Sequence, residues 1–227
     1  MSIYTLKKDC PNKIYSWAIH PTDENMLFIG GGENCKGVYQ SSDNGRNWTL
    51  IGLKEKPNDI NAITIGLDEQ GNHSIYASLS DTSIIEENGL FVSHDGGITW
   101  YKIDQFGCDV SIADPENPSN VYCGLSVRSK GNPWQNLRGL LPSVIESTVH
   151  VDHPNGVDRI IMSGTNVANQ DRPYVGIFFS TDSGASWGER ISGIGSTWAE
   201  LKIDPMDKAR IFLGTYYVNL YGATNTG

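Results

Sequence analysis

The sequence predicts an all-β fold built from repeated units of four antiparallel strands, and three observations lead to this prediction. The 227 residues include 25 glycines, 10 prolines, six tryptophans and ten tyrosines, without long apolar runs. Such a composition is typical of many short strands joined by tight turns. Two sequence elements also recur, the first three times and the second five times. A repeat length of about 40–50 residues favours an architecture assembled from copies of one small unit.

The first recurring element reads GVYQSSDNGRNW (Gly37–Trp48), GLFVSHDGGITW (Gly89–Trp100) and GIFFSTDSGASW (Gly176–Trp187). Each copy ends in Ser-x-Asp-x-Gly-x-x-Trp, which we call the Ser-Asp motif. Alternation before the serine predicts a strand with one buried face, and the motif predicts a hairpin turn. The Asp carboxylate can accept N–H groups of its own turn, the glycine supplies a positive φ, and the Trp packs back over the turn. The Asp is therefore predicted to be structural, not catalytic.

The second recurring element is a short strand, a polar turn that usually contains proline, and an apolar strand that ends in a small residue. Its copies begin at Ala18, Ala62, Ser111, His150 and Lys202. One copy of each element per unit makes four strands, so we predict a five-bladed β-propeller of four-stranded antiparallel blades. The third unit departs from the Ser-Asp motif at VRSKGNPW (Val127–Trp134).

The fifth unit stops within its own motif, where Ala223, Asn225 and Gly227 take the places of Ser, Asp and Gly. Its fourth strand is missing, and SIYTLKK (Ser2–Lys8) is similar to the strand that follows the first motif. This N-terminal strand is predicted to pair with the last blade, residues 196–227, because an open ring would leave strand edges exposed. Residues 1–227 would then form a single propeller domain. The alternative is a segment of a longer, multi-blade protein.

The Ser-Asp motifs resemble the Asp-box (BNR) repeats of sialidase-like β-propellers. The wider chain, with its recurring Pro turns, is similar to propellers related to xyloglucan-active glycosidases and to photosystem-assembly or sortilin-type proteins. The resemblance implies that the motif residues are structural and lie at the blade periphery. These residues are Ser41, Asp43, Gly45, Trp48, Ser93, Asp95, Gly97, Trp100, Ser180, Asp182, Gly184 and Trp187.

The resemblance leaves two classes of function open, because a fold does not determine a chemistry. Sialidases need an arginine triad, often announced by Arg-Ile-Pro; that tripeptide is missing and the first arginine is Arg46, inside a motif. We therefore exclude sialidase activity. The first hypothesis is a carbohydrate-active or glycan-binding propeller, glycoside hydrolase-like or part of a larger glycosidase. The second is a non-catalytic scaffold for protein partners.

The Pro turns and the Ser-Asp turns are predicted to lie on one face of the fold. The candidate site residues lie on the opposite face, in or next to the loops that follow the second and fourth strands of each unit. Aromatic faces stack on sugar C–H surfaces, and paired carboxylates can act as acid and base. The candidate catalytic residues are Asp109 and Glu146, each at the start of an innermost strand. The candidate ligand-binding residues are Tyr15, Trp17, Trp198, Tyr216 and Tyr217. Other polar residues on this rim are Glu33, Asp59, Asp81, Glu86, Glu87, Asn169, Asp171, Arg172 and Thr197.

Two of these aromatic residues have an alternative interpretation. Trp17 and Trp198 occur in the similar contexts YSWA and STWA, as core residues of a repeat would. Packing in the core of the repeat is therefore an alternative to ligand binding for both residues.

The composition argues against several classes of partner. A formal charge of −9 disfavours nucleic acid, which requires clustered Lys and Arg. No segment approaches the roughly 20 apolar residues of a membrane span, so no membrane partner is expected. The histidines do not follow metal-ligand spacing and no phosphate-binding loop is present, so neither a metal nor a cofactor is expected. No signal peptide is visible, which leaves a secreted mature form and a cytoplasmic protein equally open.

The four cysteines allow two interpretations. Cys10 with Cys35, and Cys108 with Cys123, are placed to form two disulfides within blades, which would imply an oxidising compartment. Four free thiols in a reducing compartment are the alternative.

Overall fold

The structure is a computed structural model of the 227-residue chain, and it divides into two compact units. The first unit is Met1–Cys123 with Arg128–Pro133, and the second is Gly124–Val127 with Trp134–Gly227. The residues that the structure describes are 13–67, 70, 72–79, 85–104, 108, 111–114, 116–124, 126–129, 134–137, 144–153, 159–166, 174–194, 199–204, 206–207, 209–215 and 220–224.

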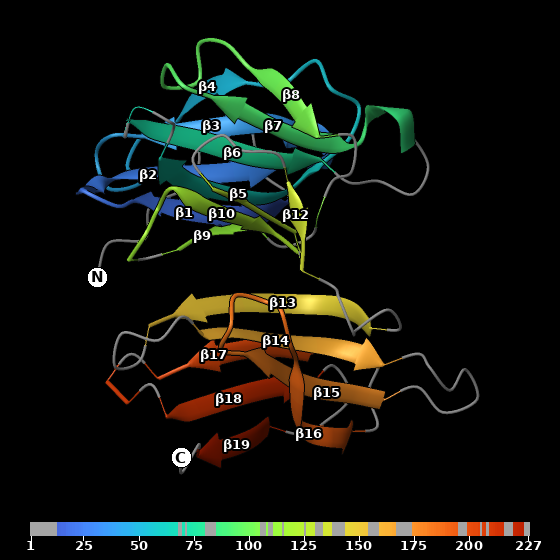
Figure 1. The fold of residues 1–227 in the computed structure, drawn as a ribbon. Coiled ribbons are helices and arrows are strands. Elements are labelled where there is room, and N and C mark those ends of the chain that lie inside the picture. The colour runs from blue at the N-terminus through green and yellow to red at the C-terminus, as the bar shows by residue number, and fades with distance from the viewer. Residues whose placement is uncertain are drawn as a thin grey trace. The chain divides into compact units, whose positions relative to one another are not determined.

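The first unit contains two four-stranded antiparallel sheets and a further strand pair (Figure 1). The first sheet has the order β1 (Ile14–His20), β2 (Asp23–Gly31), β3 (Gly37–Ser41), β4 (Thr49–Gly52). The second has the order β5 (Ile60–Leu67), β6 (His73–Leu79), β7 (Gly89–Ser93), β8 (Tyr101–Asp104). β9 (Ser111–Ala113) pairs with β10 (Asn120–Cys123). Short 3-10 helices, η1 (Glu33–Cys35) and η2 (Ile85–Glu87), precede β3 and β7.

The second unit is also built from antiparallel strands that pair in chain order. β11 (Ser126–Ser129), which the division between the units crosses, pairs with β12 (Gln135–Asn136). A four-stranded sheet follows, β13 (Val144–Asp152), β14 (Arg159–Asn166), β15 (Tyr174–Ser180), β16 (Gly188–Ile194). The described part of the last sheet has three strands, β17 (Ala199–Ile203), β18 (Arg210–Thr215) and β19 (Leu220–Thr224).

The two recurring sequence elements form the hairpins that were predicted for them. The second element gives β1–β2, β5–β6, β9–β10, β13–β14 and β17–β18. The Ser-Asp motif gives β3–β4, β7–β8 and β15–β16. The prediction of antiparallel four-stranded sheets is therefore confirmed. No closed sheet is found among the described strands, and the predicted closing strand Ser2–Lys8 lies outside them.

Apolar side chains between neighbouring sheets form the core of each unit. In the first unit Phe28 and Val38 of one sheet pack with Ile60, Leu79 and Phe91 of the next. In the second unit the core is made of Ile161, Val175, Ile177, Leu201 and Leu213. Burying one such side chain contributes about 1.5–3 kcal/mol. The middle strands are covered on both faces, which explains why β6 is buried along nearly its whole length.

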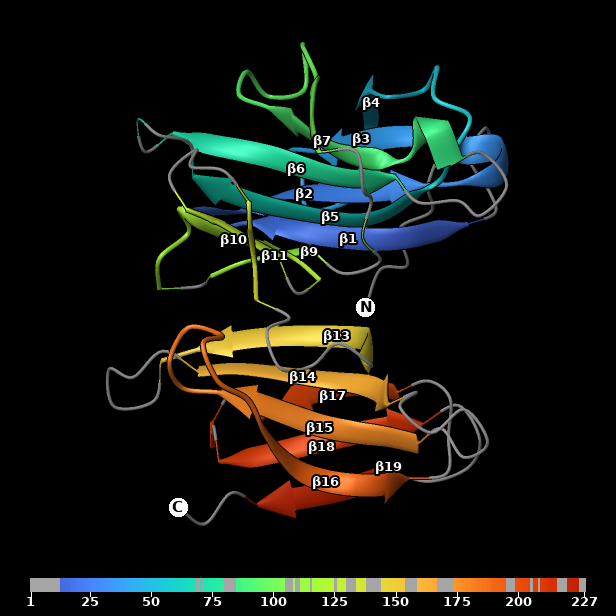
Figure 2. The ribbon, with the colours of Figure 1, turned by 45° about the vertical axis from the view of Figure 1, so that its right-hand side comes forward.

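Hydroxyl groups join the first strands of successive sheets. Ser16 Oγ of β1 donates to the carbonyl of Ile60 in β5 at 3.1 Å. Thr64 Oγ1 of β5 accepts the N–H of Ala113 in β9 at 3.0 Å. In the second unit Thr148 Oγ1 accepts the N–H of Leu201 in β17 at 3.1 Å. Within the first unit β1 and β5 consequently lie side by side (Figure 2).

One of the predicted disulfides lies within the described residues. Cys108 and Cys123 are bonded, with their Cα atoms 5.6 Å apart, and together they enclose the β9–β10 hairpin. Cys35 is also disulfide-bonded, whereas Cys10, its predicted partner, lies outside the described residues. The structure thus favours the interpretation with disulfides over free thiols at Cys35, Cys108 and Cys123.

Removal of the Cys108–Cys123 disulfide should destabilise the first unit. The bond spans a sequence separation of 15, and a loop of that size contributes about 3 kcal/mol by restricting the unfolded chain. We expect the double variant Cys108→Ser/Cys123→Ser to unfold at a lower urea concentration than the parent under non-reducing conditions. Equal unfolding midpoints would contradict this assignment.

Candidate functional site

The three Ser-Asp turns, residues 41–48, 93–100 and 180–187, share one hydrogen-bond network. In the second turn Ser93 Oγ donates to Asp95 Oδ1 and accepts the N–H of Gly97, both at 2.8 Å. Asp95 Oδ1 also accepts the N–H of Thr99 at 2.9 Å. The same bonds measure 2.7–2.8 Å in the first and third turns. Each carboxylate thus holds its own turn together.

A further member of the network is the residue before each Trp. The side chains of Asn47, Thr99 and Ser186 donate to the second carboxylate oxygen at 2.6, 2.6 and 2.5 Å. Sequence reasoning missed this position because the three residues differ in type and share only a short polar donor. These side-chain bonds, followed by backbone N–H groups, lower the pKa of Asp43, Asp95 and Asp182 from 3.8 to about 2.

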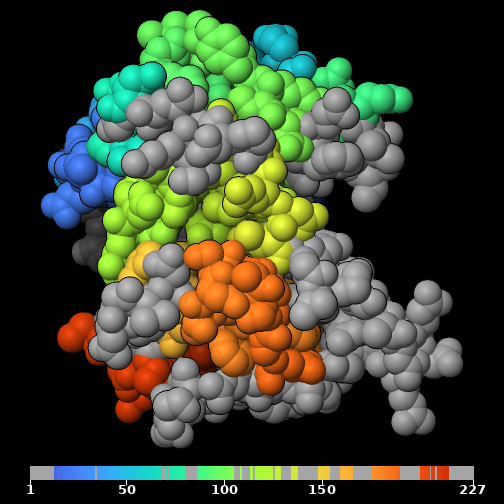
Figure 3. All heavy atoms as spheres, viewed as in Figure 1, coloured from blue at the N-terminus to red at the C-terminus, as the bar shows by residue number. Residues whose placement is uncertain are grey.

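The backbone of each turn contains two successive residues in the left-handed region. The motif glycines Gly45, Gly97 and Gly184 have φ of 83°, 95° and 86°, which confirms the predicted positive φ. The residues before them, Asn44, Gly96 and Ser183, have φ of 59°, 74° and 56°. The outer hairpin that contains the second turn forms part of the surface drawn in green in Figure 3.

Two of the motif tryptophans, Trp100 and Trp187, connect their turns to preceding strands. Trp100 Nε1 donates to Gly97 of its own turn at 3.0 Å and to the carbonyl of Ile51 in β4 at 3.2 Å. Trp187 Nε1 donates to the carbonyl of Leu137, which follows β12, at 2.8 Å. The turn therefore fixes a ring that also holds the sheet, or the strand pair, before it in the chain.

Substitutions at the adjacent glycines Gly96 and Gly97 allow the effects of backbone strain and steric crowding to be measured separately. A Cβ at Gly97 would lie 2.6 Å from Ile51 Cδ1, whereas a Cβ at Gly96 meets nothing within 4 Å. Both residues have positive φ, which costs an alanine about 1–2 kcal/mol. Overpacking adds about 1–3 kcal/mol at Gly97 alone. We expect Gly97→Ala to lower the free energy of unfolding clearly more than Gly96→Ala does in urea denaturation; equal losses would contradict the packing of Gly97 on Ile51.

Acid should remove the contribution of the Asp carboxylates. Because their pKa is lower in the folded protein, their stabilisation is complete above pH 3.8 and is lost as the pH falls towards 2. We expect Asp95→Asn to lower the urea midpoint at neutral pH, and the difference from the parent to shrink between pH 4 and pH 2. The exposed Glu24→Gln is the control and should leave the midpoint unchanged. A difference independent of pH would argue against a charge-assisted network.

Residues from three segments of the first unit meet on the loop side of β1 and β5, and we call them the loop-face cluster: Lys13, Tyr15, Gly32, Glu33 and Asp59. A Cβ at Gly32 would lie 2.2 Å from the Tyr15 ring and 2.6 Å from the Asp59 carboxyl carbon, so only glycine allows this approach. Asp59 Oδ1 accepts the N–H of Glu33 at 3.0 Å. Glu33 forms an ion pair with Lys13 and raises the pKa of that lysine.

The geometry of the loop-face cluster is unusual in two respects. Glu33 has a φ of 52°, a left-handed conformation that costs a residue other than glycine about 1–3 kcal/mol. Tyr15 is 46% exposed although it is a large aromatic residue. Strained backbone held by neighbouring groups, next to an exposed aromatic ring, is typical of binding sites. The cluster can present an aromatic face and a carboxylate to a ligand.

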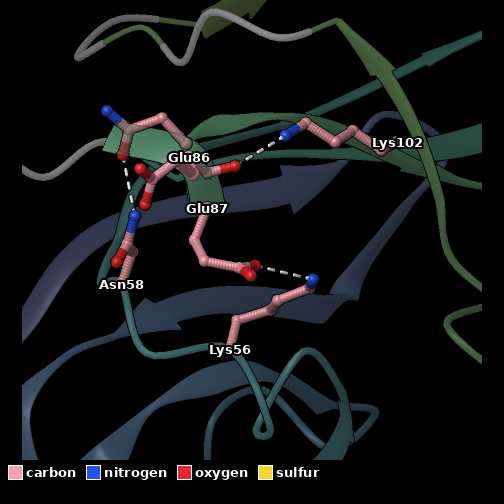
Figure 4. Close-up of polar contacts among 6 residues, drawn as sticks. Lys56, Asn58, Glu86, Glu87 and Lys102 are labelled. Atoms are coloured by element: carbon pink, nitrogen blue, oxygen red, sulfur yellow. Dashed lines mark hydrogen bonds and ion pairs between the residues drawn. The ribbon is translucent and has the colours of Figure 1, made fainter. Parts of the chain in front are cut away.

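Polar contacts continue over the next loops of the first unit (Figure 4). Lys56 Nζ pairs with Glu87 Oε2 at 2.9 Å, which lowers the pKa of Glu87, and lies 5.4 Å from the centre of the Phe91 ring. Asn58 donates to Asn88 Oδ1 at 2.7 Å. Lys102 Nζ donates to the backbone carbonyl of Glu86 at 3.3 Å. The first two contacts join the β4–β5 loop to η2 and to the residue that follows it, and the third joins β8 to η2.

The structure places only part of the predicted site. Tyr15, Glu33 and Asp59 meet in the loop-face cluster. Glu146 lies in β13 with its backbone opposite Gly164, and its side chain is outside the described part of the structure. The candidates outside the described residues are Asp81, Asp109, Asn169, Asp171, Arg172, Thr197, Trp198, Tyr216 and Tyr217.

Trp17 lies farther along β1, away from the cluster. It is 70% exposed and borders a groove of about 320 Å³ within the first unit. Other residues that line the groove are Ile19, Pro21, Ile63, Ile65 and Pro118. The groove is mainly apolar, so it offers a surface for packing more than a set of polar ligands.

Two histidines contact each other on the turn side of the first unit. The rings of His20 and His73 meet edge to face with centroids 4.3 Å apart, and burial followed by the neighbouring His73 lowers the pKa of His20. Within the described ranges, no three His, Cys, Asp or Glu side chains are grouped to hold a metal ion. No helix in the described part of the chain has the length and apolar character needed to cross a membrane.

Comparisons with known proteins identify the fold. No family model and no curated protein matches the sequence. Among solved structures, the GH74 xyloglucanase from Xanthomonas campestris has a TM-score of 0.67 at 18% identity, over 94% of this chain and 37% of its own. An ancestral GH74 enzyme has a TM-score of 0.64 at 19% identity, over 93% of this chain and 30% of its own. YCF48 bound to D1 peptide has a TM-score of 0.60 at 16% identity, over 95% and 64%.

This chain has a propeller-like fold. Its predicted likeness to propellers related to xyloglucan-active glycosidases is confirmed at the level of fold, which is all that such identities show. The chain spans about a third of the length of the two GH74 enzymes and under two thirds of YCF48.

Proposed function

We propose that this propeller-like protein binds glycans through the loop-face cluster. The observation that carries the proposal is the exposed Tyr15 ring next to the Asp59 carboxylate. A tyrosine face can stack on the C–H surface of a pyranose, and a carboxylate oxygen accepts hydrogen bonds from sugar hydroxyls. Asp59 uses Oδ1 for the N–H of Glu33, and Oδ2 has no hydrogen bond within the described residues.

The arrangement of the cluster supports binding by a preformed site. The bond from Glu33 N–H to Asp59 fixes the carboxylate, and the absence of a side chain at Gly32 lets the ring and the carboxylate approach each other. A site that is ordered before binding loses less entropy when a ligand arrives. The structural likeness to two GH74 enzymes, one of them a xyloglucanase, is consistent with a carbohydrate ligand.

The remaining predicted residues would extend this site. Trp17, Trp198, Tyr216 and Tyr217 would supply further aromatic contacts. Asp109 and Glu146 would supply the acid and base if the protein also hydrolyses its ligand, as glycoside hydrolases do with paired carboxylates. Loss of hydrolysis with retained binding in Asp109→Asn or Glu146→Gln would identify the catalytic group; hydrolysis unaffected by either change would exclude both.

We further propose that the units form a single, closed five-bladed Asp-box propeller. The hydroxyl bonds between first strands support this arrangement, because such strands surround the channel of a propeller. The strand Ser2–Lys8 would complete the last blade. Slow hydrogen exchange at residues 3–6 is expected, and rapid exchange there would contradict closure.

A protein scaffold is the second candidate function. The likeness to YCF48, whose structure contains a bound D1 peptide, favours it, as do the exposed apolar residues Ile14, Trp17 and Ile19 along β1. A third candidate is a segment of a larger glycosidase, consistent with the share of the GH74 chains that this chain spans.

The glycan proposal is tested with a panel of neutral oligosaccharides derived from xyloglucan, cellulose, xylan and arabinan. We expect binding by calorimetry, and we expect Tyr15→Ala to weaken it about fivefold or more, by analogy with the stacking of nucleobases on aromatic side chains, which contributes about 1–3 kcal/mol. The matched control is Tyr101→Ala, an equally large change at a 58% exposed tyrosine on β8. It should leave the affinity unchanged.

Two outcomes would contradict the proposal. Equal losses in Tyr15→Ala and Tyr101→Ala would show that the loop-face cluster is not the site. Failure to bind any glycan of the panel, together with recovery of a defined protein partner that Tyr15→Ala releases, would favour the scaffold.

A further inference from the structure

Asp59, the carboxylate beside Tyr15, has no ion pair with any basic side chain among the residues that the structure describes. Lys13, the ammonium group in the same cluster, is paired with Glu33. Asp59 is half-buried, and among the described residues it accepts a hydrogen bond only from the N–H of Glu33. The loop-face cluster therefore has a net charge of −1, from one lysine and two carboxylates.

Other charged residues of these loops lie elsewhere. Lys56 is paired with Glu87, and Lys102 donates to the carbonyl of Glu86 (Figure 4). Asp59, in contrast, directly precedes β5, next to β1. Lys56 and Lys102 therefore have partners other than Asp59.

We infer that the loop-face cluster selects neutral glycans over anionic ones, with Asp59 as the specificity-determining residue. The inference rests on the proposed glycan binding. A neutral sugar can donate a hydroxyl to Asp59 Oδ2, whereas a carboxylate on the ligand would approach a like charge held in place by Glu33 N–H. Because the cluster is partly exposed to solvent, salt screens the repulsion between the two carboxylates, and the repulsion therefore depends on ionic strength.

The test compares two ligands that differ by one charge. The first is the neutral oligosaccharide that binds best in the panel; the second is the same oligosaccharide with its primary alcohol oxidised to a uronic acid. In the unchanged protein at low salt, we expect the oxidised form to bind about tenfold more weakly. The ratio should decrease as salt is added.

Two variants assign the discrimination to Asp59. In Asp59→Asn the amide oxygen can still accept the N–H of Glu33, so the local structure is kept while the charge is removed. We expect the ratio of affinities to fall to within about threefold of unity, because the like charge is gone. The control Glu55→Gln removes an exposed carboxylate from the same loop and should leave the ratio as in the parent.

The outcomes separate the two proposals. Equal affinity for the neutral and oxidised sugars, or an unchanged ratio in Asp59→Asn, would overturn the specificity and leave glycan binding in place. Absence of binding by every neutral sugar would overturn both.

Discussion

The fold depends on the carboxylate at the centre of each Ser-Asp turn. It accepts hydrogen bonds from a serine hydroxyl and from both the backbone N–H and the side chain of the residue before the Trp. These bonds close a turn in which two successive residues have positive φ. Without these bonds, two successive positive φ values would be unfavourable even with glycine present. The closed turn also places the indole N–H of Trp100 against the carbonyl of Ile51 in the preceding sheet. A local network thus determines a contact between sheets.

This arrangement separates the residues of the Ser-Asp network from the residues of the proposed binding site. The Ser-Asp turns form the outer hairpins β3–β4, β7–β8 and β15–β16. Loops after the second and fourth strands carry no part of that network, so their composition is free to vary. In the first unit they bring Tyr15, Glu33 and Asp59 together. A stable outer frame can therefore support a specialised inner rim.

Much of the fold could be predicted from the sequence because both repeated elements are local. A hairpin is defined by about a dozen residues, and the glycine and Asp positions specify its turn. The partners of the Trp rings could not be predicted, since Ile51 and Leu137 lie 49 and 50 residues before them. Side-chain donors at Asn47, Thr99 and Ser186 escaped notice because chemically different residues serve there. The sequence predicts which loops share one face of the fold. It does not predict the bond from Glu33 to Asp59, which depends on loop conformations that the repeats do not determine.

The residues with positive φ fall into two groups: those that the repeated turns require and those outside these turns. Asn44, Gly96 and Ser183 recur at one repeat position, and each precedes a glycine whose N–H is bound to a serine hydroxyl, so the fold itself requires them. Leu53 is also left-handed, but its side chain packs against the core, and this burial offsets the cost. Glu33 has an exposed side chain and no such compensation from packing. Its conformation is held by the bond to Asp59 from the next loop, so the backbone strain in the loop-face cluster is not explained by the repeat and is consistent with the proposed site.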